Sequence, residues 1–129
     1  MPNLTALVAL VSVFAYFGVG FAVGKARNTY NVKAPATTGD PNFERIFRAQ
    51  QNMLEWMPIF LPTLLLFGLY VSDRWAAILG LVWIVGRIVY TAAYAQAAEK
   101  RSTGFFIQAA ATLALMIGAL VGIMRALIA

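Results

Sequence analysis

The sequence has 129 residues, of which 61% are hydrophobic and 12% charged, with a net charge of +5 and no cysteine or histidine. This composition excludes a typical soluble domain, any disulfide or thiolate nucleophile, an imidazole base, and a metal site built on Cys or His. The basic residues lie in short segments between apolar stretches, so no basic domain exists to bind nucleic acid.

Four apolar stretches are long enough to cross a bilayer as helices, which takes about 20 residues each. We therefore predict an all-α fold, an integral membrane four-helix bundle that forms a single domain over residues 1–129. Membrane lipid is then an obligatory partner. The predicted helices are 4–24, 41–70, 75–101 and 104–128.

The first predicted helix carries no charge, and Gly18, Gly20 and Gly24 permit close packing with a neighbouring helix. It lacks the basic flank of a secretory signal and exceeds the usual apolar length of one, so we expect it to be retained. A small four-helix antiporter would need an essential carboxylate in this helix. None is present, which argues against that class.

The second predicted helix begins at Asp40 and Pro41, because Asp is a favoured cap and proline at the first helical position loses no hydrogen bond. Pro58 and Pro62 each remove a backbone hydrogen bond and are expected to kink the helix. The short turn VSDR, 71–74, forces the second and third helices into an antiparallel hairpin.

The charges between the helices predict the orientation in the membrane. By the positive-inside rule, the first and third loops face the cytoplasm and both termini face outward. Arg125, near the outer end of the last helix, mildly opposes this assignment. The loop cations that support it are Lys25, Arg27, Lys33, Lys100 and Arg101, whereas the second loop pairs Arg74 with Asp73.

Polar residues form one stripe on the second helix and another on the third. At about 100° per residue, one face of the second helix holds Arg45, Arg48, Gln51, Asn52 and Glu55. The matching face of the third helix holds Arg87, Tyr90 and Tyr94, and Arg101 joins it if that helix continues. Depths counted along the antiparallel helices place Glu55 level with Arg87. Because an unpaired charge near the bilayer centre is costly, we predict that these two neutralise each other.

A buried ion pair could simply lock the bundle, and this structural interpretation competes with a functional one. One lock needs only two charges, whereas the two faces together offer many more polar groups. Guanidinium groups match carboxylates in a planar fork, a carboxylate accepts from an ammonium group, and amides and phenols can satisfy peptide groups. The pattern therefore favours a site for a small zwitterionic ligand with several carboxylates.

Three segments resemble the MAPEG superfamily, the membrane-associated proteins of eicosanoid and glutathione metabolism. They are FERIFRAQQNMLEWMPIFL, PATTGDP and GRIVYTAAYAQAAEKR, and the similarity extends from about Ala26 to Gly122. The resemblance is greatest to the branch of the microsomal glutathione transferases and the cysteinyl-leukotriene synthase. It implies a homotrimer of four-helix protomers that binds glutathione between neighbouring subunits, with the active site toward the cytoplasmic side.

The resemblance also implies roles for individual residues, and the absence of Cys and His means that no metal is expected. Arg101 corresponds to the arginine that holds the glutathione sulfur as a thiolate and is the predicted catalytic residue. Trp56 stands where the leukotriene synthase has a tyrosine that contacts glutathione, and Arg45 and Arg87 are supporting residues. Arg27 and Gln50 would reach the ligand from the next subunit. The remaining predicted glutathione ligands are Arg48, Asn52, Glu55, Tyr90 and Tyr94.

The implied activity is a glutathione transferase that joins its co-substrate glutathione to a hydrophobic electrophile, with reduction of lipid hydroperoxides as an open second activity. Asn28 replaces a second arginine of the leukotriene synthase, and Tyr90 replaces the histidine of the prostaglandin E synthase branch, so neither of those activities is expected. The alternative is a non-catalytic, lipid-presenting member of the same superfamily. That member lacks the sulfur-holding arginine, and Arg101 therefore argues against it.

Overall fold

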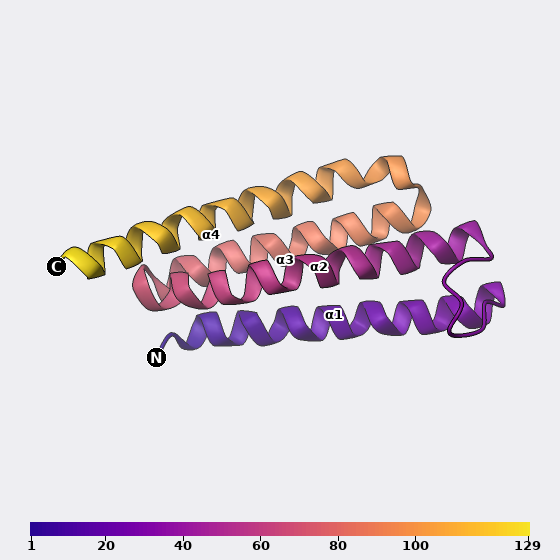
Figure 1. The fold of residues 1–129 in the computed structure, drawn as a ribbon, viewed down its shortest axis with the longest axis horizontal. Helices are drawn as coiled ribbons and strands as arrows, with labels where there is room; N and C mark the ends of the chain where they lie inside the picture. The colour runs from indigo at the N-terminus through magenta and orange to yellow at the C-terminus, as the bar shows by residue number, and fades with distance from the viewer.

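The computed structural model describes residues 1–129, which form four long helices and one short 3-10 turn. Successive long helices run antiparallel, so both termini lie at one end of the bundle (Figure 1). Each of the four is long and apolar enough to span a membrane, and the predicted all-α membrane bundle is confirmed. The elements are α1 (Asn3–Tyr30), α2 (Pro41–Tyr70), α3 (Asp73–Gln96), η1 (Ala98–Arg101) and α4 (Ser102–Ile128).

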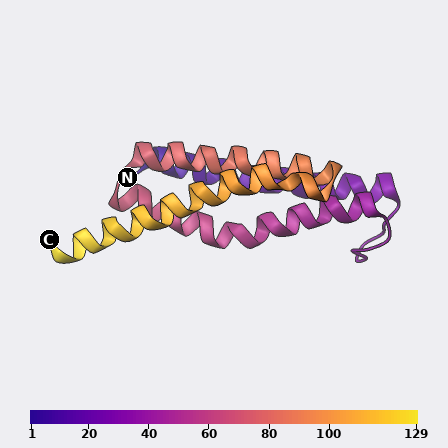
Figure 2. The ribbon, with the colours of Figure 1, turned by 90° about the horizontal axis from the view of Figure 1, so that it is seen from above.

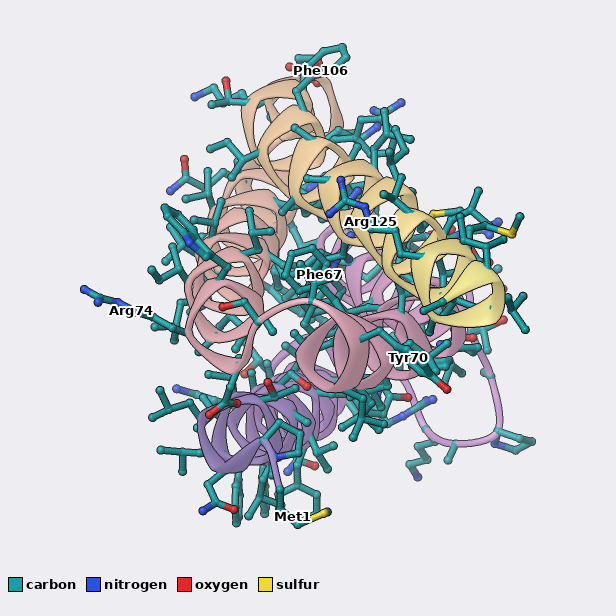
Figure 3. The ribbon with its side chains drawn as sticks, turned by 90° about the vertical axis from the view of Figure 1, so that its left-hand side faces the viewer. Met1, Phe67, Tyr70, Arg74, Phe106 and Arg125 are labelled. Atoms are coloured by element: carbon teal, nitrogen blue, oxygen red, sulfur yellow. The ribbon has the colours of Figure 1, made fainter.

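The hairpin of α2 and α3 forms the centre of the bundle. Seen from the end that carries the termini, α1 and α4 pack on different sides of this hairpin, and each contacts both α2 and α3 (Figure 3). Phe67 lies between the helices in this view, whereas Arg74 extends away from them. Deeper in the core, Phe60 of α2 stacks on Trp83 of α3 with ring centroids 3.8 Å apart, and both side chains are fully buried.

Large apolar side chains cover the outside of the bundle. Phe14, Phe17 and Phe21 of α1 each expose more than half of their surface, as do Leu120 and Leu127 of α4. A soluble monomer rarely exposes so large a contiguous apolar surface. A bilayer removes such side chains from water without a second protein layer.

The start of α2 lies where the sequence predicts it. The Asp40 side chain accepts hydrogen bonds from the backbone N–H groups of Asn42, at 2.8 Å, and Phe43, at 3.3 Å, and Pro41 occupies the first turn. Pro58 and Pro62 lie inside α2, and the helix is bowed along its length (Figure 2). The cap fixes where the polar first half of α2 begins.

The first helix is longer than predicted. α1 continues six residues past Gly24 to Tyr30, where Asn31 adopts a left-handed conformation (φ 55°, ψ 46°) and its N–H bonds to the Arg27 carbonyl. The apolar stretch marks only the part of a helix that can lie in lipid, and the polar residues that follow it continue the helix. Arg27 therefore lies on the last turn of a helix and not in a loop.

The third helix is shorter than predicted. α3 ends at Gln96, Ala97 is extended, and Ala98–Arg101 form the 3-10 turn that leads directly into α4. The reason is tertiary packing, because Gly104 of α4 lies directly against the backbone of Tyr90. If α3 continued as a helix to Arg101, the chain could not reverse direction in time for Gly104 to contact Tyr90.

Candidate functional site

A polar pocket of about 430 Å³ lies at the end of the bundle opposite the two termini. Its volume falls in the range of small-molecule sites, roughly 300 to 1,000 Å³. Side chains from the first half of α2, the last turns of α3 and η1 form its wall. They are Arg48, Gln51, Asn52, Glu55, Tyr90, Tyr94 and Arg101.

The α2 side of the pocket follows from helical spacing. Arg48, Asn52 and Glu55 recur at intervals of four and three residues, which brings them to one face of the helix. Beside this face Ala49 and Met53 are buried and hold α2 against the bundle. Arg48 and Glu55 are exposed, so their charged groups are available to a ligand.

The α3 side consists of two tyrosines held on a tightly packed helix. The rings of Tyr90 and Tyr94 lie 5.6 Å apart, centroid to centroid, and Tyr90 is almost fully buried. Gly104 allows α4 to approach the Tyr90 backbone, because any side chain there would overlap the Tyr90 N and Cα atoms. This close approach fixes the last turns of α3 relative to α4.

Arg101 reaches the pocket from η1. Its Nη1 atom donates a hydrogen bond to the Ala98 carbonyl at 2.6 Å, and its Cζ atom lies 5.6 Å from the centroid of the Tyr94 ring. The side chain is exposed at the edge of the pocket. The continuous third helix that was expected to carry Arg101 is wrong, but the 3-10 turn brings this guanidinium to the same polar face.

The predicted neutralisation of Glu55 by Arg87 is wrong. Arg87 is 1% exposed, and its Nη1 atom donates to the Asn52 Oδ1 atom at 2.8 Å. Its Cζ atom lies 4.4 Å from the centroid of the Tyr90 ring. Counting depth by Cα position missed this pairing because a guanidinium lies several ångströms from its own Cα. Glu55 is left free at the pocket wall.

Arg45 lies outside the pocket and ties two helices together. Its Nε atom donates to the Ala95 carbonyl in the last turn of α3 at 3.3 Å, and its Nη2 atom donates to the Asn42 side chain. The carbonyl groups in the last turn of a helix have no partner within that helix. Arg45 therefore gives one of these carbonyl groups a hydrogen-bond donor, and it holds α2 beside the end of α3.

Three predicted ligands are not among the residues that line this pocket. Gln50 faces α1 and lines a separate groove of about 380 Å³, which is otherwise mostly apolar and is formed by Val13, Tyr16, Phe17, Gly20, Phe21 and Gly24. Trp56 packs edge-on against Phe105 of α4, with centroids 5.9 Å apart. Arg27 donates to the Ala36 carbonyl at 2.8 Å and lies over the Phe43 ring.

Gln51 also lines the pocket, although it is not among the predicted glutathione ligands. Its angle on α2 places it on the polar face, and that angle is the only signal that could have identified it. Within the chain no group of three His, Cys, Asp or Glu side chains gathers to hold a metal ion. The chemistry of the pocket is thus that of guanidinium, carboxylate, amide and phenol groups.

The sequence of this chain is similar to those of known proteins over most of its length. Residues 5–121 match the MAPEG family. An uncharacterized protein of Synechocystis sp. is 45% identical over 92% of this chain and 87% of its own. Human microsomal glutathione S-transferase 2 is 48% identical over 81% of this chain and 74% of its own, and rat leukotriene C4 synthase is 37% identical over 96% and 85%.

Proposed function

This chain belongs to the MAPEG family, and from that premise we propose that it is a membrane-bound glutathione transferase that conjugates glutathione to lipophilic electrophiles. Relatives named as a glutathione transferase and a leukotriene C4 synthase support a glutathione-dependent activity in general. The more specific reaction is inferred from the pocket. Its hydrophobic co-substrate would approach from the lipid, since apolar side chains cover the outside of the bundle.

The arrangement of charge in the pocket is the observation that carries this proposal. Two guanidinium groups, Arg48 and Arg101, share the wall with one carboxylate, Glu55. Arg48 matches a carboxylate of glutathione and Glu55 matches its ammonium group, which leaves Arg101 for the sulfur. The Asn52 amide and the phenol groups of Tyr90 and Tyr94 can hydrogen-bond its peptide groups.

Arg101 is the group that we assign to the glutathione sulfur. A cysteine thiol has a pKa of about 8.5, and a fixed cation nearby favours its ionised form. The thiol releases its proton to water, and the thiolate then attacks an electrophilic carbon. A carbon–sulfur bond forms as the bond to the leaving group breaks. Because the chain has no histidine or cysteine, the activation is electrostatic.

The proposed site faces the cytoplasm. The pocket lies at the end of the bundle where α1 and α3 finish, and the loop cations gather at that same end. The proposal also includes a homotrimer, in which Arg27 and Gln50 of one subunit reach the pocket of the next. The Gln50 position supports this, because Gln50 lines a groove against α1 and not its own chain's polar pocket.

Thiolate formation tests the proposal directly. Adding glutathione to the purified protein in detergent should produce ultraviolet thiolate absorbance at neutral pH, with at most one glutathione bound per subunit. Arg101→Ala should abolish the absorbance and lower the conjugation rate by about a hundredfold or more, because it removes a cation aimed at the reacting sulfur. Lys100→Ala, a neighbouring cation outside the pocket, serves as the control.

Two results would contradict the proposal. Conjugation by Arg101→Ala at the wild-type rate would refute the assigned role of that residue. Calorimetry that shows no glutathione binding by the intact, folded protein would refute the transferase and favour the non-catalytic, lipid-presenting alternative.

A further inference from the structure

Arg87 is a buried cation, and the stability of the fold does not explain why it is there. Its side chain is 1% exposed, it forms no ion pair, and its Nε and Nη2 atoms have no hydrogen-bond partner. Its only hydrogen bond is from Nη1 to Asn52 Oδ1. Burying a charge that has no ion-pair partner costs free energy, so this side chain does not stabilise the bundle through its charge. The contact with Asn52 therefore points to a role other than holding the bundle together.

The contact between Arg87 and Asn52 determines which way the Asn52 amide faces. An asparagine side chain has an acceptor, Oδ1, and a donor, Nδ2, whereas a guanidinium has donors only. Only Oδ1 can face Arg87, because the reversed amide would place two donors against each other and leave both unsatisfied. The Nδ2 donor must then face away from Arg87.

The Nδ2 atom of Asn52 is available to a ligand. Asn52 lines the polar pocket, and its Nδ2 atom is neither hydrogen-bonded within the chain nor sealed from solvent. Arg87 itself does not line the pocket, and the Tyr90 ring covers its guanidinium at 4.4 Å. Arg87 can thus influence a ligand only through its neighbours.

Resting on the proposed function, we propose that Arg87 is a positioning residue that fixes Asn52 as an obligatory hydrogen-bond donor to glutathione. The pocket then selects, at the depth of Asn52, a ligand that presents a carbonyl or carboxylate oxygen. Peptide carbonyls and carboxylates of the tripeptide meet this requirement. A ligand that presents only an N–H group at that point is rejected, because two donors would meet.

A double-mutant cycle on glutathione binding tests this role. Arg87→Met and Asn52→Ala should each raise the Kd measured by calorimetry about tenfold, since each removes an oriented donor to a charged or polar oxygen. The double variant should bind no more weakly than Asn52→Ala alone, because without the amide there is nothing left to orient. Arg87→Lys, which keeps a donor for Oδ1, should restore most of the affinity.

Gln108→Met is the matched control. Gln108 is also fully buried with both amide atoms unpartnered, but it does not line the pocket, so its replacement should leave the Kd unchanged. Asn52→Asp adds a variant that keeps Arg87 intact. An aspartate can pair with Arg87 but offers the ligand no donor, so it should lose as much affinity as Asn52→Ala while the protein stays folded.

Three outcomes would overturn the inference. They are an Arg87→Met variant that binds glutathione as the wild type does, penalties that add in the double variant, and an Asn52→Asp variant with wild-type affinity. All three presuppose that the wild type binds glutathione, which separates them from a failure of the proposed function. A wild-type protein that ignores glutathione would refute both.

Discussion

At the scale of single residues, the pocket is organised by which charges remain unpaired. Arg45 donates a hydrogen bond to the Ala95 carbonyl, and Arg87 donates one to the Asn52 amide oxygen. Glu55 and Arg48 have no hydrogen-bond or ion-pair partner in the chain. Charges that are free at a site next to an apolar bundle interact more strongly with a ligand than they would in open water. The free charges should therefore contact the ligand directly, whereas Arg87 acts on it through the Asn52 amide.

Glu55→Gln should weaken glutathione binding about tenfold, because it removes the only carboxylate that can accept from the ligand ammonium group. N-acetylated glutathione lacks that ammonium group, so the variant should bind it about as well as the wild type does. Isothermal calorimetry with both ligands measures the difference. Glu99→Gln, an exposed carboxylate of η1 outside the pocket, is the control and should change neither affinity. A variant that still prefers glutathione over its N-acetylated form would contradict the role of Glu55.

The sequence predicts the polar stripe but not its internal pairing. Helical periodicity depends only on residue spacing, so it correctly brings Arg48, Asn52 and Glu55 to one face. The position of a guanidinium depends on rotamers and on the opposing helix. For this reason depth along the helices predicts a pair of Arg87 with Glu55, whereas the structure pairs Arg87 with Asn52.

At the scale of helices, each boundary is predictable when it is set locally and unpredictable when it is set by packing. The start of α2 depends on Asp40 and Pro41, which act within one turn, and the sequence identifies it. The end of α3 depends on Gly104, which contacts the Tyr90 backbone from another helix. Nothing in the residues around Gln96 forces a helix to stop there, so local patterning extends α3 too far.

Gly104→Ala should destabilise the protein by about 1 to 3 kcal/mol, the usual cost of overpacking a close contact. The added Cβ atom would overlap the Tyr90 backbone and come within 2.7 Å of the Gly86 carbonyl, so α3 and α4 must separate. Thermal unfolding in detergent, followed by circular dichroism, measures the loss. Gly18→Ala, where an added Cβ atom meets nothing within 4 Å, should be neutral. Equal stability of the two variants would refute the proposed packing constraint.

At the scale of the whole molecule, one chain carries polar residues in two separate places, the polar pocket and the groove beside α1. Arg48 and Glu55 are exposed in a polar pocket on one face, while Gln50 lies in the groove beside α1. Gln50 and Arg48 are two residues apart, which is about 200° around a helix, so both cannot easily serve one ligand from the same chain. A closed ring of identical subunits can bring the two faces together at every interface.

Mixed assembly tests this arrangement. Gln50→Ala and Arg48→Ala should each weaken glutathione binding when assembled alone. When the two variants are co-expressed in equal amounts, a random cyclic trimer should recover intact sites at about a quarter of its interfaces, where one chain supplies Arg48 and its neighbour supplies Gln50. The number of high-affinity sites by calorimetry measures the recovery. If none returns, Gln50 and Arg48 do not meet across an interface.

The position of the two termini has a practical consequence. Both ends of the chain lie at the end of the bundle away from the polar pocket (Figure 1). A reporter or affinity handle fused to either end would therefore emerge on the far side of the bilayer. Nanodiscs captured on a sensor surface through such a handle would present the pocket to the flowing solution, so that association and dissociation of peptides could be followed in real time.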